Sequence, residues 1–509
     1  MIHKLTFVVI ISFILLSAVL RYRSGEIDYR NSDATWHTLL TIECYNETPA
    51  SEHLFLPIVS LGGENDKYIP WGATIPDEKG NYYYTSFSAA GFFVAWLFIK
   101  IFRLPVAEES LYVFNNILLT VSAVLLMWLL SMVYEKSNHR ELLCFLGGMS
   151  YIWSPELLHG LGIVYWSQSI MQITILLQII FYYRYTVKGE KSSRLLFYIM
   201  ALVNPYIEWT GYVVNVGFAI TELFLNWKSD RKNAMGKAVI LGFITTASFG
   251  LFCIHYLLRV DAGMFFNALK NRFMARNVTA TTLLTDVMGG YLKSFLYLWI
   301  LLLIVLVWCF IVKGCLDLRN GVLFFVMSFP ILENVIMKQH ALYYTYDRMK
   351  AVFVLVLLLC EVVRNILEVK SGKKTVIALA GVTILISSWN LHSYIKNESY
   401  IWNVDYRKNN EQMAEYITTL YPDAVYASDT DIRGYINLLF GRGIYEFTSV
   451  DTAKEIARGK GEENVVYIEK DGYKLLTVTL HSINSDIWTQ YTVANGELVE
   501  KRGNEPYDE

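Results

Sequence analysis

Residues 28–47 read DYRNSDATWHTLLTIECYNE and follow directly on the first apolar run of the chain. That run, about residues 5–21, is long enough to cross a bilayer, and a lysine before it favours a cytoplasmic N-terminus. The quoted stretch therefore begins on the far side of the membrane. It places Asp33, Trp36 and His37 close to the outer surface of the bilayer.

The composition excludes an ordinary water-soluble protein. Of the 509 residues 54% are hydrophobic, and they gather in repeated apolar runs of span length. The net charge of −2 hides an asymmetry, because residues 392–509 hold 12 Lys and Arg against 20 Asp and Glu, whereas the rest of the chain is basic. This acidic tail argues against a nucleic-acid partner. The six cysteines show no spacing typical of a disulfide framework or a metal site.

The short apolar stretch at residues 87–103 decides the topology. Lys and Arg collect in the cytoplasmic loops of membrane proteins. If residues 87–103 do not cross, all five basic segments between spans are cytoplasmic, and the tail lies outside. The five segments are residues 135–141, 184–194, 228–237, 313–320 and 364–374. About eleven spans result, at residues 5–21, 111–134, 141–159, 161–183, 195–227 (a hairpin of two), 237–257, 291–312, 321–337, 346–366 and 374–391.

The chain divides at about residue 391. Residues 1–391 form the expected transmembrane domain, which includes a large first external loop, residues 22–86, and an interfacial helix over residues 87–103. In residues 392–509 short apolar segments alternate with helical patterns, which is typical of a small α/β domain with a partly parallel sheet. The predicted fold class is therefore mainly α: a polytopic membrane helical bundle with a C-terminal extracytoplasmic α/β domain.

Asp33 is the first candidate catalytic residue. A carboxylate near the interface can take a proton from an attacking hydroxyl group, but an Asp before an apolar-periodic run also caps a helix. His37 and Trp36 can stack on a sugar or anchor the loop among the lipid head groups.

Two further acids are predicted on the outer side. Glu156 follows Pro155 at the external end of a span, where it can act as a second catalytic acid or as an ordinary solvated residue. Glu208 lies at the tip of the 195–227 hairpin and is a weaker substrate-binding candidate.

Basic side chains on the same side are candidates for binding phosphate. Arg259 and Arg276 flank an amphipathic pattern in the external loop, and Arg suits bidentate phosphate binding. Attraction to anionic lipid head groups explains them equally well. His340 and Arg348 lie in another external turn, where a histidine is often structural. The ionisable groups lie at span ends, and an ion pathway would need them near the membrane midplane.

The membrane part resembles the GT-C superfamily of polytopic glycosyltransferases, which includes protein O-mannosyltransferases, the aminoarabinose transferase of lipid A and oligosaccharyltransferases. The similarity lies in an acid soon after the first span (Asp33) and a tyrosine-rich segment, residues 82–87, ahead of a non-crossing helix. The span ending in Ser-Pro-Glu at residues 154–156 and the loop around His340 are also similar.

Three positions depart from the pattern of those relatives. Ala-Ala-Gly stands at residues 89–91 where Pro-Pro-Leu or Pro-Pro-Gly is frequent, and Tyr344 stands where a second histidine often occurs. Asp33 is a single acid where several relatives have two adjacent acids.

The resemblance implies an inverting transfer of a sugar from a polyprenyl-phosphate donor to a glycan, lipid or protein acceptor. Asp33 would act as the general base, and Arg or His side chains would bind the donor phosphate. Relatives with monophosphate donors need no metal, and no dense acidic cluster is visible here, so a divalent metal is not favoured and no other cofactor is expected. The implied location is the plasma membrane of a bacterium.

Two other classes of function stay open from the sequence. O-antigen polymerases and ligases also combine many spans with external arginines, although their large loop usually comes late in the chain. A transporter would need ionisable groups at the membrane midplane or broken helices, and only Asn204-Pro205 hints at such a break.

Overall fold

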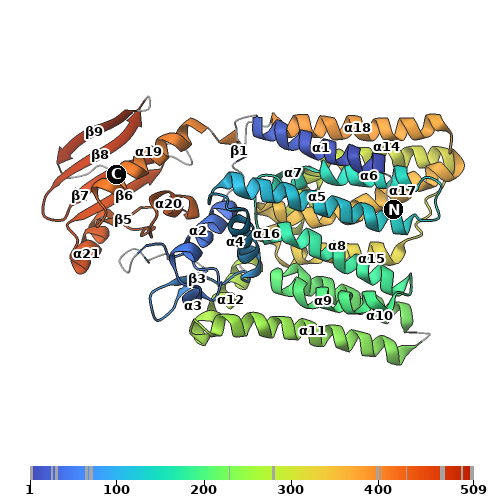
Figure 1. Ribbon diagram of the computed structural model, residues 1–509, viewed down its shortest axis with the longest axis horizontal. Helices are drawn as coiled ribbons and strands as arrows, with labels where there is room; N and C mark the ends of the chain where they lie inside the picture. Colours follow the sequence, from blue (N-terminus) through green and yellow to red (C-terminus); the bar gives the residue numbers. More distant parts are fainter. Residues whose placement is uncertain are drawn as a thin grey trace. The chain divides into compact units, whose positions relative to one another are not determined.

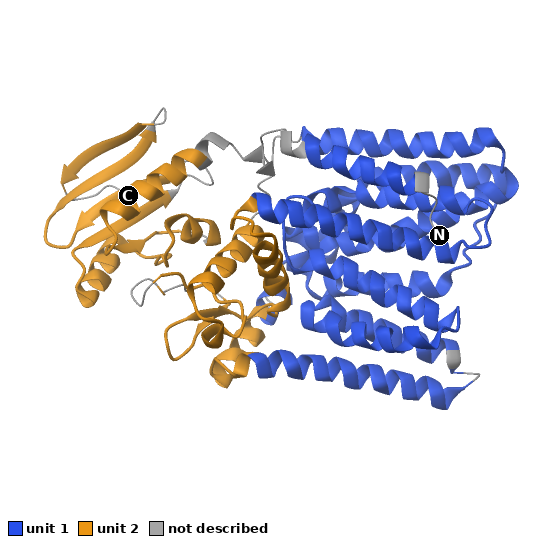
Figure 2. Ribbon diagram, viewed as in Figure 1, with its two compact units in different colours: residues 1–24, 109–255, 273–399 blue, residues 25–108, 256–272, 400–509 orange. Residues whose placement is uncertain are grey.

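The computed structural model describes residues 4–23, 27–28, 33–62, 67, 73–227, 230–277, 281–396, 401–402, 404–430, 433–470, 476–494 and 497–504. The described chain is mainly helical and ends in a β-sheet, as predicted (Figure 1). It separates into two compact units (Figure 2). Unit 1 comprises Met1–Ser24, Glu109–His255 and Phe273–Ser399, and unit 2 comprises Gly25–Glu108, Tyr256–Arg272 and Tyr400–Glu509.

Unit 1 is a bundle of long helices lying side by side (Figure 1). All or most of each of the following lies in it: α1 Lys4–Arg23, α5 Glu108–Val133, α6 Arg140–Ile152, α7 Pro155–Gly160, α8 Ser167–Thr186, α9 Lys191–Ile207, α10 Thr210–Asn226, α11 Arg231–Leu257, α13 Leu284–Ser294, α14 Leu296–Lys313, α15 Gly321–Ile336, α16 Lys338–Tyr343, the 3-10 helix η2 Thr345–Ala351, α17 Val352–Val369 and α18 Lys373–Ile395. Each of the eleven predicted spans coincides with one or two of these helices.

Four described helices are both long and apolar enough to span a membrane: α5, α11, α14 and α18. Shorter apolar helices occur at Thr6–Leu20, Ala90–Phe102, Thr210–Leu225 and Gly321–Ile336. Exposed large apolar side chains are frequent on these helices, for example Phe243 on α11, which is 75% exposed, and Ile311 on α14, which is 77% exposed. A surface of this kind suits lipid contact, and the bundle is that of an integral membrane protein.

Polar side chains join the middle helices of the bundle. Gln178 of α8 accepts a hydrogen bond from Asn204 of α9 at 2.5 Å and donates one to Asn215 of α10 at 2.8 Å. Asn215 also donates to the Thr245 hydroxyl of α11 at 3.0 Å. Such interhelical bonds fix the order of helices in a membrane, where apolar packing alone distinguishes neighbours poorly.

Unit 2 combines the first loop with the tail. The loop contributes α2 (Asp33–Glu47), α3 (Ala50–His53), the hairpin β2 (Thr74–Pro76) and β3 (Tyr82–Tyr84), and α4 (Ala90–Phe102). With 13 residues α4 is about 20 Å long by the α-helical rise, which is less than a hydrocarbon core of about 30 Å. A helix of this length is short for a span, and the non-crossing of residues 87–103, inferred from the basic segments, stays a prediction.

The tail forms a five-stranded sheet in the order β5-β6-β7-β8-β9. β5 (Val425–Ala427) and β6 (Asn464–Lys470) are parallel, and β7 (Leu476–Ser482), β8 (Ile487–Ala494) and β9 (Glu497–Asn504) continue antiparallel. α19 (Val404–Leu420) and α20 (Arg433–Phe440) cover one face, and α21 (Val450–Lys460) covers the other. The expected α/β fold is confirmed. β9, whose side chains are mostly exposed and give no apolar signal, was not predicted from the sequence.

The tail also packs on the first loop within unit 2. The rings of Trp36 on α2 and Tyr435 on α20 lie 4.5 Å apart. A β-carbon added at Gly434 would lie 3.2 Å from the backbone nitrogen of His37, so the two helices meet almost backbone to backbone. The start of α2, where Asp33 lies, is therefore part of the same packed body as the tail.

Candidate functional site in the helical bundle

One end of the unit 1 bundle holds a cluster of charged and polar side chains that are each less than a tenth exposed. It lies at the starts of α7 and α8, the α9–α10 junction, the end of α15, and the segment from α16 to η2 that leads into α17. Its members are Glu156, Gln168, Glu208, Glu333, His340, Asp347, Arg348 and Lys350. Buried charges are costly unless they are paired, so each charged group of the cluster is expected to have a partner.

Lys350 lies at the centre of this cluster. Its ammonium group donates to the Asp347 Oδ1 and Thr210 Oγ1 atoms, each at 3.0 Å, and forms a short ion pair with Glu333. Residues i and i+3 eclipse one another in a 3-10 helix, so η2 itself brings Asp347 and Lys350 together. All three ammonium protons are therefore used.

Asp347 connects Lys350 to His340. The Asp347 Oδ2 atom lies 3.1 Å from the His340 Nδ1 atom. Burial lowers the pKa of His340 to about 4, and this outweighs the opposing effect of the Asp347 carboxylate. His340 is therefore neutral near pH 7, with its Nδ1 proton directed at Asp347 and Nε2 as the acceptor nitrogen.

Arg348 holds Glu156 in place. Its Nη2 atom donates to Glu156 Oε1 at 3.2 Å, and its Nε atom donates to the Ser294 hydroxyl at 2.7 Å. Its Nη1 atom donates to the backbone carbonyls of Ala341 and Leu342. Four of the five guanidinium protons are thus engaged. Glu156 itself is in the first turn of α7, which Pro155 begins at the position where proline is favoured.

Glu208 occupies the tight connection between α9 and α10. Its Oε2 atom accepts the backbone N–H of Thr210 at 2.8 Å, and its Oε1 atom lies 3.5 Å from Gln168 Nε2. Burial raises the pKa of Glu208, with Lys350 opposing the shift. A β-carbon on Gly211 would lie 2.3 Å from the backbone nitrogen of Pro205, so this connection requires glycine.

Glu208, Glu333 and Asp347 offer carboxylate oxygens within 4.8 Å of one another, which is a spacing suited to a divalent cation. The Lys350 ammonium group already lies between two of these carboxylates and takes the position of a cation. With Lys350 in place the three acids do not fit a metal ion, and no chemical step is assigned to one.

Several polar atoms at the cluster have no hydrogen-bond partner among the described residues. They are Glu156 Oε2, Gln168 Oε1 and the Tyr291 hydroxyl, all fully buried. Buried polar atoms of native proteins are nearly always satisfied by protein, water or a ligand. Together with four carboxylates facing only two permanent cations, these atoms mark the cluster as a binding site for a polar molecule.

Arg276, predicted to bind phosphate, also lies in unit 1. It is 6% exposed at the end of α12 (Ala262–Asn277), and its side chain forms no ion pair or hydrogen bond with another described residue. Its positive charge contributes to the lowered pKa of His340. Four more of the predicted residues, Glu156, Glu208, His340 and Arg348, are thus in the same unit as Arg276 and within the cluster.

The remaining predicted site residues lie in unit 2. Asp33 is the first residue of α2, and its side chain is half-buried. His37 is buried, with its ring 4.4 Å from that of Tyr84, and burial lowers its pKa to about 3. Arg259 donates to the backbone carbonyl of Ser51, which joins two segments of unit 2.

Five residues of the cluster and its surroundings were not predicted from the sequence: Glu333, Lys350, Tyr291, Thr210 and Ser294. The signal for Lys350 was the charged run Asp-Arg-Met-Lys directly before an apolar span, where unpaired charges would be costly. Tyr291, Thr210 and Ser294 carry no such signal, because their polar role depends on which helices meet.

The arrangement defines a fold. Polytopic helices, a long first loop packed on a C-terminal α/β domain, and buried polar groups at the helix ends are together the fold of the GT-C membrane glycosyltransferases, and solved structures of that class match this chain along its length.

Three solved structures are similar to this chain. ArnT from Cupriavidus metallidurans matches in the apo state with a TM-score of 0.56 and 8% identity, covering 91% of this chain and 92% of ArnT. The same enzyme bound to undecaprenyl phosphate matches with a TM-score of 0.55 and 9% identity, covering 90% and 92%. The Archaeoglobus fulgidus oligosaccharyltransferase in the apo form matches with a TM-score of 0.53 and 11% identity, covering 90% of this chain and 69% of that one.

The sequence comparisons gave a different result from the structure comparison. No family model matches it, and no curated protein is significantly similar to it. The likeness to the solved structures therefore establishes the fold.

Proposed function

We propose that this chain is a membrane glycosyltransferase that moves a sugar from a polyprenyl-phosphate donor to an acceptor on the extracytoplasmic side. The observation that carries the proposal is the buried cluster of unit 1, whose unsatisfied carboxylate, amide and phenol atoms suit a ligand rich in hydroxyl groups. The fold supports it, because one matched structure is of an enzyme bound to undecaprenyl phosphate.

The proposed reaction is a single displacement. The acceptor hydroxyl oxygen bonds to the anomeric carbon, the bond from that carbon to the phosphate oxygen breaks, and the electron pair leaves with polyprenyl phosphate. Asp33 takes the proton of the acceptor hydroxyl. One displacement at the anomeric carbon inverts its configuration. General-base catalysis of this kind contributes about 10²- to 10⁴-fold in rate.

Within unit 1 the groups divide between binding and support. Glu156 presents its Oε2 atom to a sugar hydroxyl while Arg348 fixes the carboxylate from the other side. Arg276 is a buried cation with no ion-pair partner among the described residues, and it is proposed to bind the donor phosphate. Lys350 neutralises the deeper acids, so the proposed activity needs no divalent metal.

The test uses purified full-length protein in liposomes, with panels of polyprenyl-monophosphate sugars and polyprenyl-diphosphate oligosaccharides as donors. Transfer from a monophosphate donor that persists in EDTA supports the proposal. Use of diphosphate oligosaccharides alone would favour the polymerase or ligase class. Arg276→Gln is expected to raise KM for the donor, whereas Arg231→Gln, at the start of α11, is the matched control and is expected to leave KM unchanged.

A further inference from the structure

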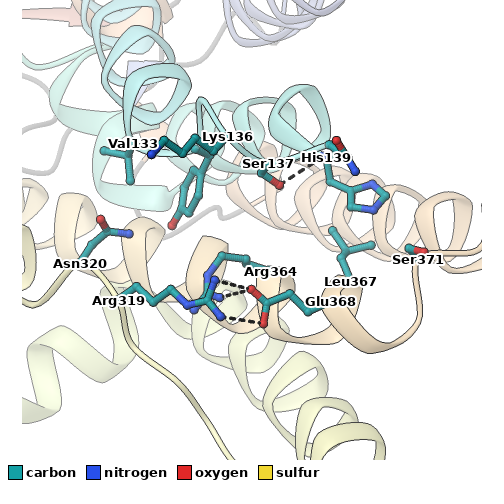
Figure 3. A pocket seen from close by; sticks show the side chains of 12 residues that line it. Val133, Lys136, Ser137, His139, Arg319, Asn320, Arg364, Leu367, Glu368 and Ser371 are labelled. Atoms are coloured by element: carbon teal, nitrogen blue, oxygen red, sulfur yellow. Dashed lines mark hydrogen bonds and ion pairs between the residues drawn. The ribbon is translucent and has the colours of Figure 1, made fainter. Parts of the chain in front are cut away.

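The other end of the unit 1 bundle contains a cavity of about 460 Å³ (Figure 3). It lies where α5, α14 and α17 end and where α6, α15 and α18 begin. The cluster described above precedes α17, and this cavity adjoins the end of α17. The 18 residues of α17 separate the two by about 27 Å at the α-helical rise, so the cavity is a separate site.

Three of the five basic segments of the sequence, residues 135–141, 313–320 and 364–374, supply most of the cavity wall. The sequence analysis predicts all three to be cytoplasmic. Segments far apart in the chain thus bring their basic side chains to one hollow between membrane helices.

The base of the cavity is a closed network of charges. Fully buried Glu361 accepts hydrogen bonds from Tyr134 at 2.8 Å, Asn320 at 2.5 Å and Arg364 at 3.0 Å. Glu368 pairs with Arg364, with Arg319 at 2.7 Å and with Lys313 at 3.1 Å. These contacts hold the helix ends rigidly and orient the two arginines, which converge on Glu368 in Figure 3.

The network leaves one positive charge in excess. Its three carboxylates, Asp317, Glu361 and Glu368, are matched by Lys313, Arg319 and Arg364. Lys136 also lines the cavity, across from Arg319 in Figure 3, and forms no hydrogen bond or ion pair with another described residue. Arg319 keeps 56% of its side chain exposed, and His139 lines the same wall.

We propose that this cavity binds the phosphoryl head group of an anionic membrane lipid, at the end of the bundle opposite to the polar cluster. Basic pockets between transmembrane helices on the cytoplasmic side recognise such head groups. Lys136 supplies the unmatched charge, and Arg319 presents its exposed edge to the phosphoryl oxygens. The volume is in the range of small-molecule sites, and apolar helix surfaces beside it suit the acyl chains.

This inference is independent of the proposed transferase activity. It requires neither sugar transfer nor any residue of the polar cluster, and its test is a binding measurement on the intact protein.

The test is native mass spectrometry of the full-length protein in detergent, titrated with phosphatidylglycerol, phosphatidylcholine or soluble glycerol phosphate. The variants are Lys136→Gln and Lys136→Glu, which alter an exposed side chain, with Lys232→Gln and Lys232→Glu as matched controls. Lys232 is an exposed lysine at the start of α11, and α11 supplies no residue to the cavity wall. Loss of one cation is expected to weaken phosphatidylglycerol binding roughly fivefold.

The proposal expects the wild-type protein and both Lys232 variants to retain phosphatidylglycerol equally, Lys136→Gln to retain less and Lys136→Glu least. Equal losses at both lysines would show general surface attraction and overturn it. Equal retention of phosphatidylcholine would overturn the requirement for an anionic lipid. Displacement of the lipid by glycerol phosphate at equal concentration would overturn the lipid source and leave a site for a soluble phosphate ester.

Discussion

The ammonium group of Lys350 compensates the charge of the buried carboxylates in the bundle. It is 3% exposed and joins Glu333, Asp347 and Thr210, which come from three different elements. Removing one partner of a buried ion pair leaves the other charge uncompensated, which costs about 3–5 kcal/mol. The stability of this end of the bundle is therefore expected to depend on a single ammonium group.

Lys350→Met is predicted to lower the free energy of unfolding by about 3–5 kcal/mol, because Glu333 and Asp347 lose their cation while volume is kept. Thermal unfolding in detergent measures this. The double variant Lys350→Met with Glu333→Gln is the control and should be less destabilised than the single one, since it removes one of the stranded charges. A change below about 1 kcal/mol in the single variant would contradict the role given to Lys350.

The same lysine predicts a response to metal ions. In Lys350→Ala the oxygens of Glu208, Glu333 and Asp347 are open to a divalent cation, so Mn²⁺ should raise the melting temperature of this variant and leave that of the wild type unchanged. Mn²⁺ that stabilises the wild type as strongly would show that the three acids bind metal with the lysine present.

His340 predicts the pH dependence of stability. Its pKa falls from 6.5 to about 4 on folding because burial disfavours the charged ring. Between these values the unfolded chain binds more protons, so the free energy of unfolding decreases as the pH falls through this window, by about 3 kcal/mol in full.

The measurement compares unfolding of the wild type and His340→Gln from pH 7 to pH 4. The difference between the two proteins should shrink steadily as the pH falls, because the variant has no ring to protonate at this position. Other titrating groups, including Glu208 and His37, cancel in that difference. A difference that is constant with pH would show that His340 folds with an ordinary pKa.

At the scale of elements, the α9–α10 turn places Glu208 in the cluster. A β-carbon at Gly211 meets the backbone of Asn204 and Pro205, which has no room to move aside without opening the turn. Gly242, on α11, has nothing within 4 Å of the same added atom and serves as a matched glycine in a helix.

Gly211→Ala is predicted to destabilise the protein by about 1–3 kcal/mol through overpacking, whereas Gly242→Ala should leave stability unchanged or raise it slightly. Melting curves of the two variants decide this. Equal melting temperatures of Gly211→Ala and Gly242→Ala would contradict the close approach of the two helices at this turn.

Most elements were predictable from the sequence because apolar run length and periodicity record burial in lipid or core directly. The helices of the bundle, α19 to α21 and the parallel pair β5–β6 followed from such patterns. β9 did not, since its side chains are mostly exposed and resemble those of a loop.

The site was only partly predictable. Glu156, Glu208, His340 and Arg348 were identified because charges at span ends are conspicuous. Their partners were not, because the pairing of Arg348 with Glu156, 192 positions apart, depends on how α7 and η2 pack. Buried networks are formed by tertiary contacts. Only their charged members, which are costly to bury, can therefore be recognised from the sequence.

At the scale of the whole molecule, the chain consists of two compact units of different construction. Unit 1 is a membrane bundle with separate polar sites toward opposite ends of α17, and unit 2 joins the first loop to the tail through α2 and α20. Asp33 belongs to the second unit and the buried cluster to the first. The proposed reaction assigns Asp33 a chemical role that its place at the start of α2 alone does not require.

The most direct test is the rate of sugar transfer from a polyprenyl-phosphate donor by purified wild type, Asp33→Asn and Asp230→Asn. Asn caps a helix about as well as Asp, so both variants should fold and melt like the wild type. The account predicts that Asp33→Asn loses at least about 10²-fold in rate while Asp230→Asn, at an exposed helix start, keeps full activity. Full activity in Asp33→Asn would contradict the assignment of Asp33 as the base.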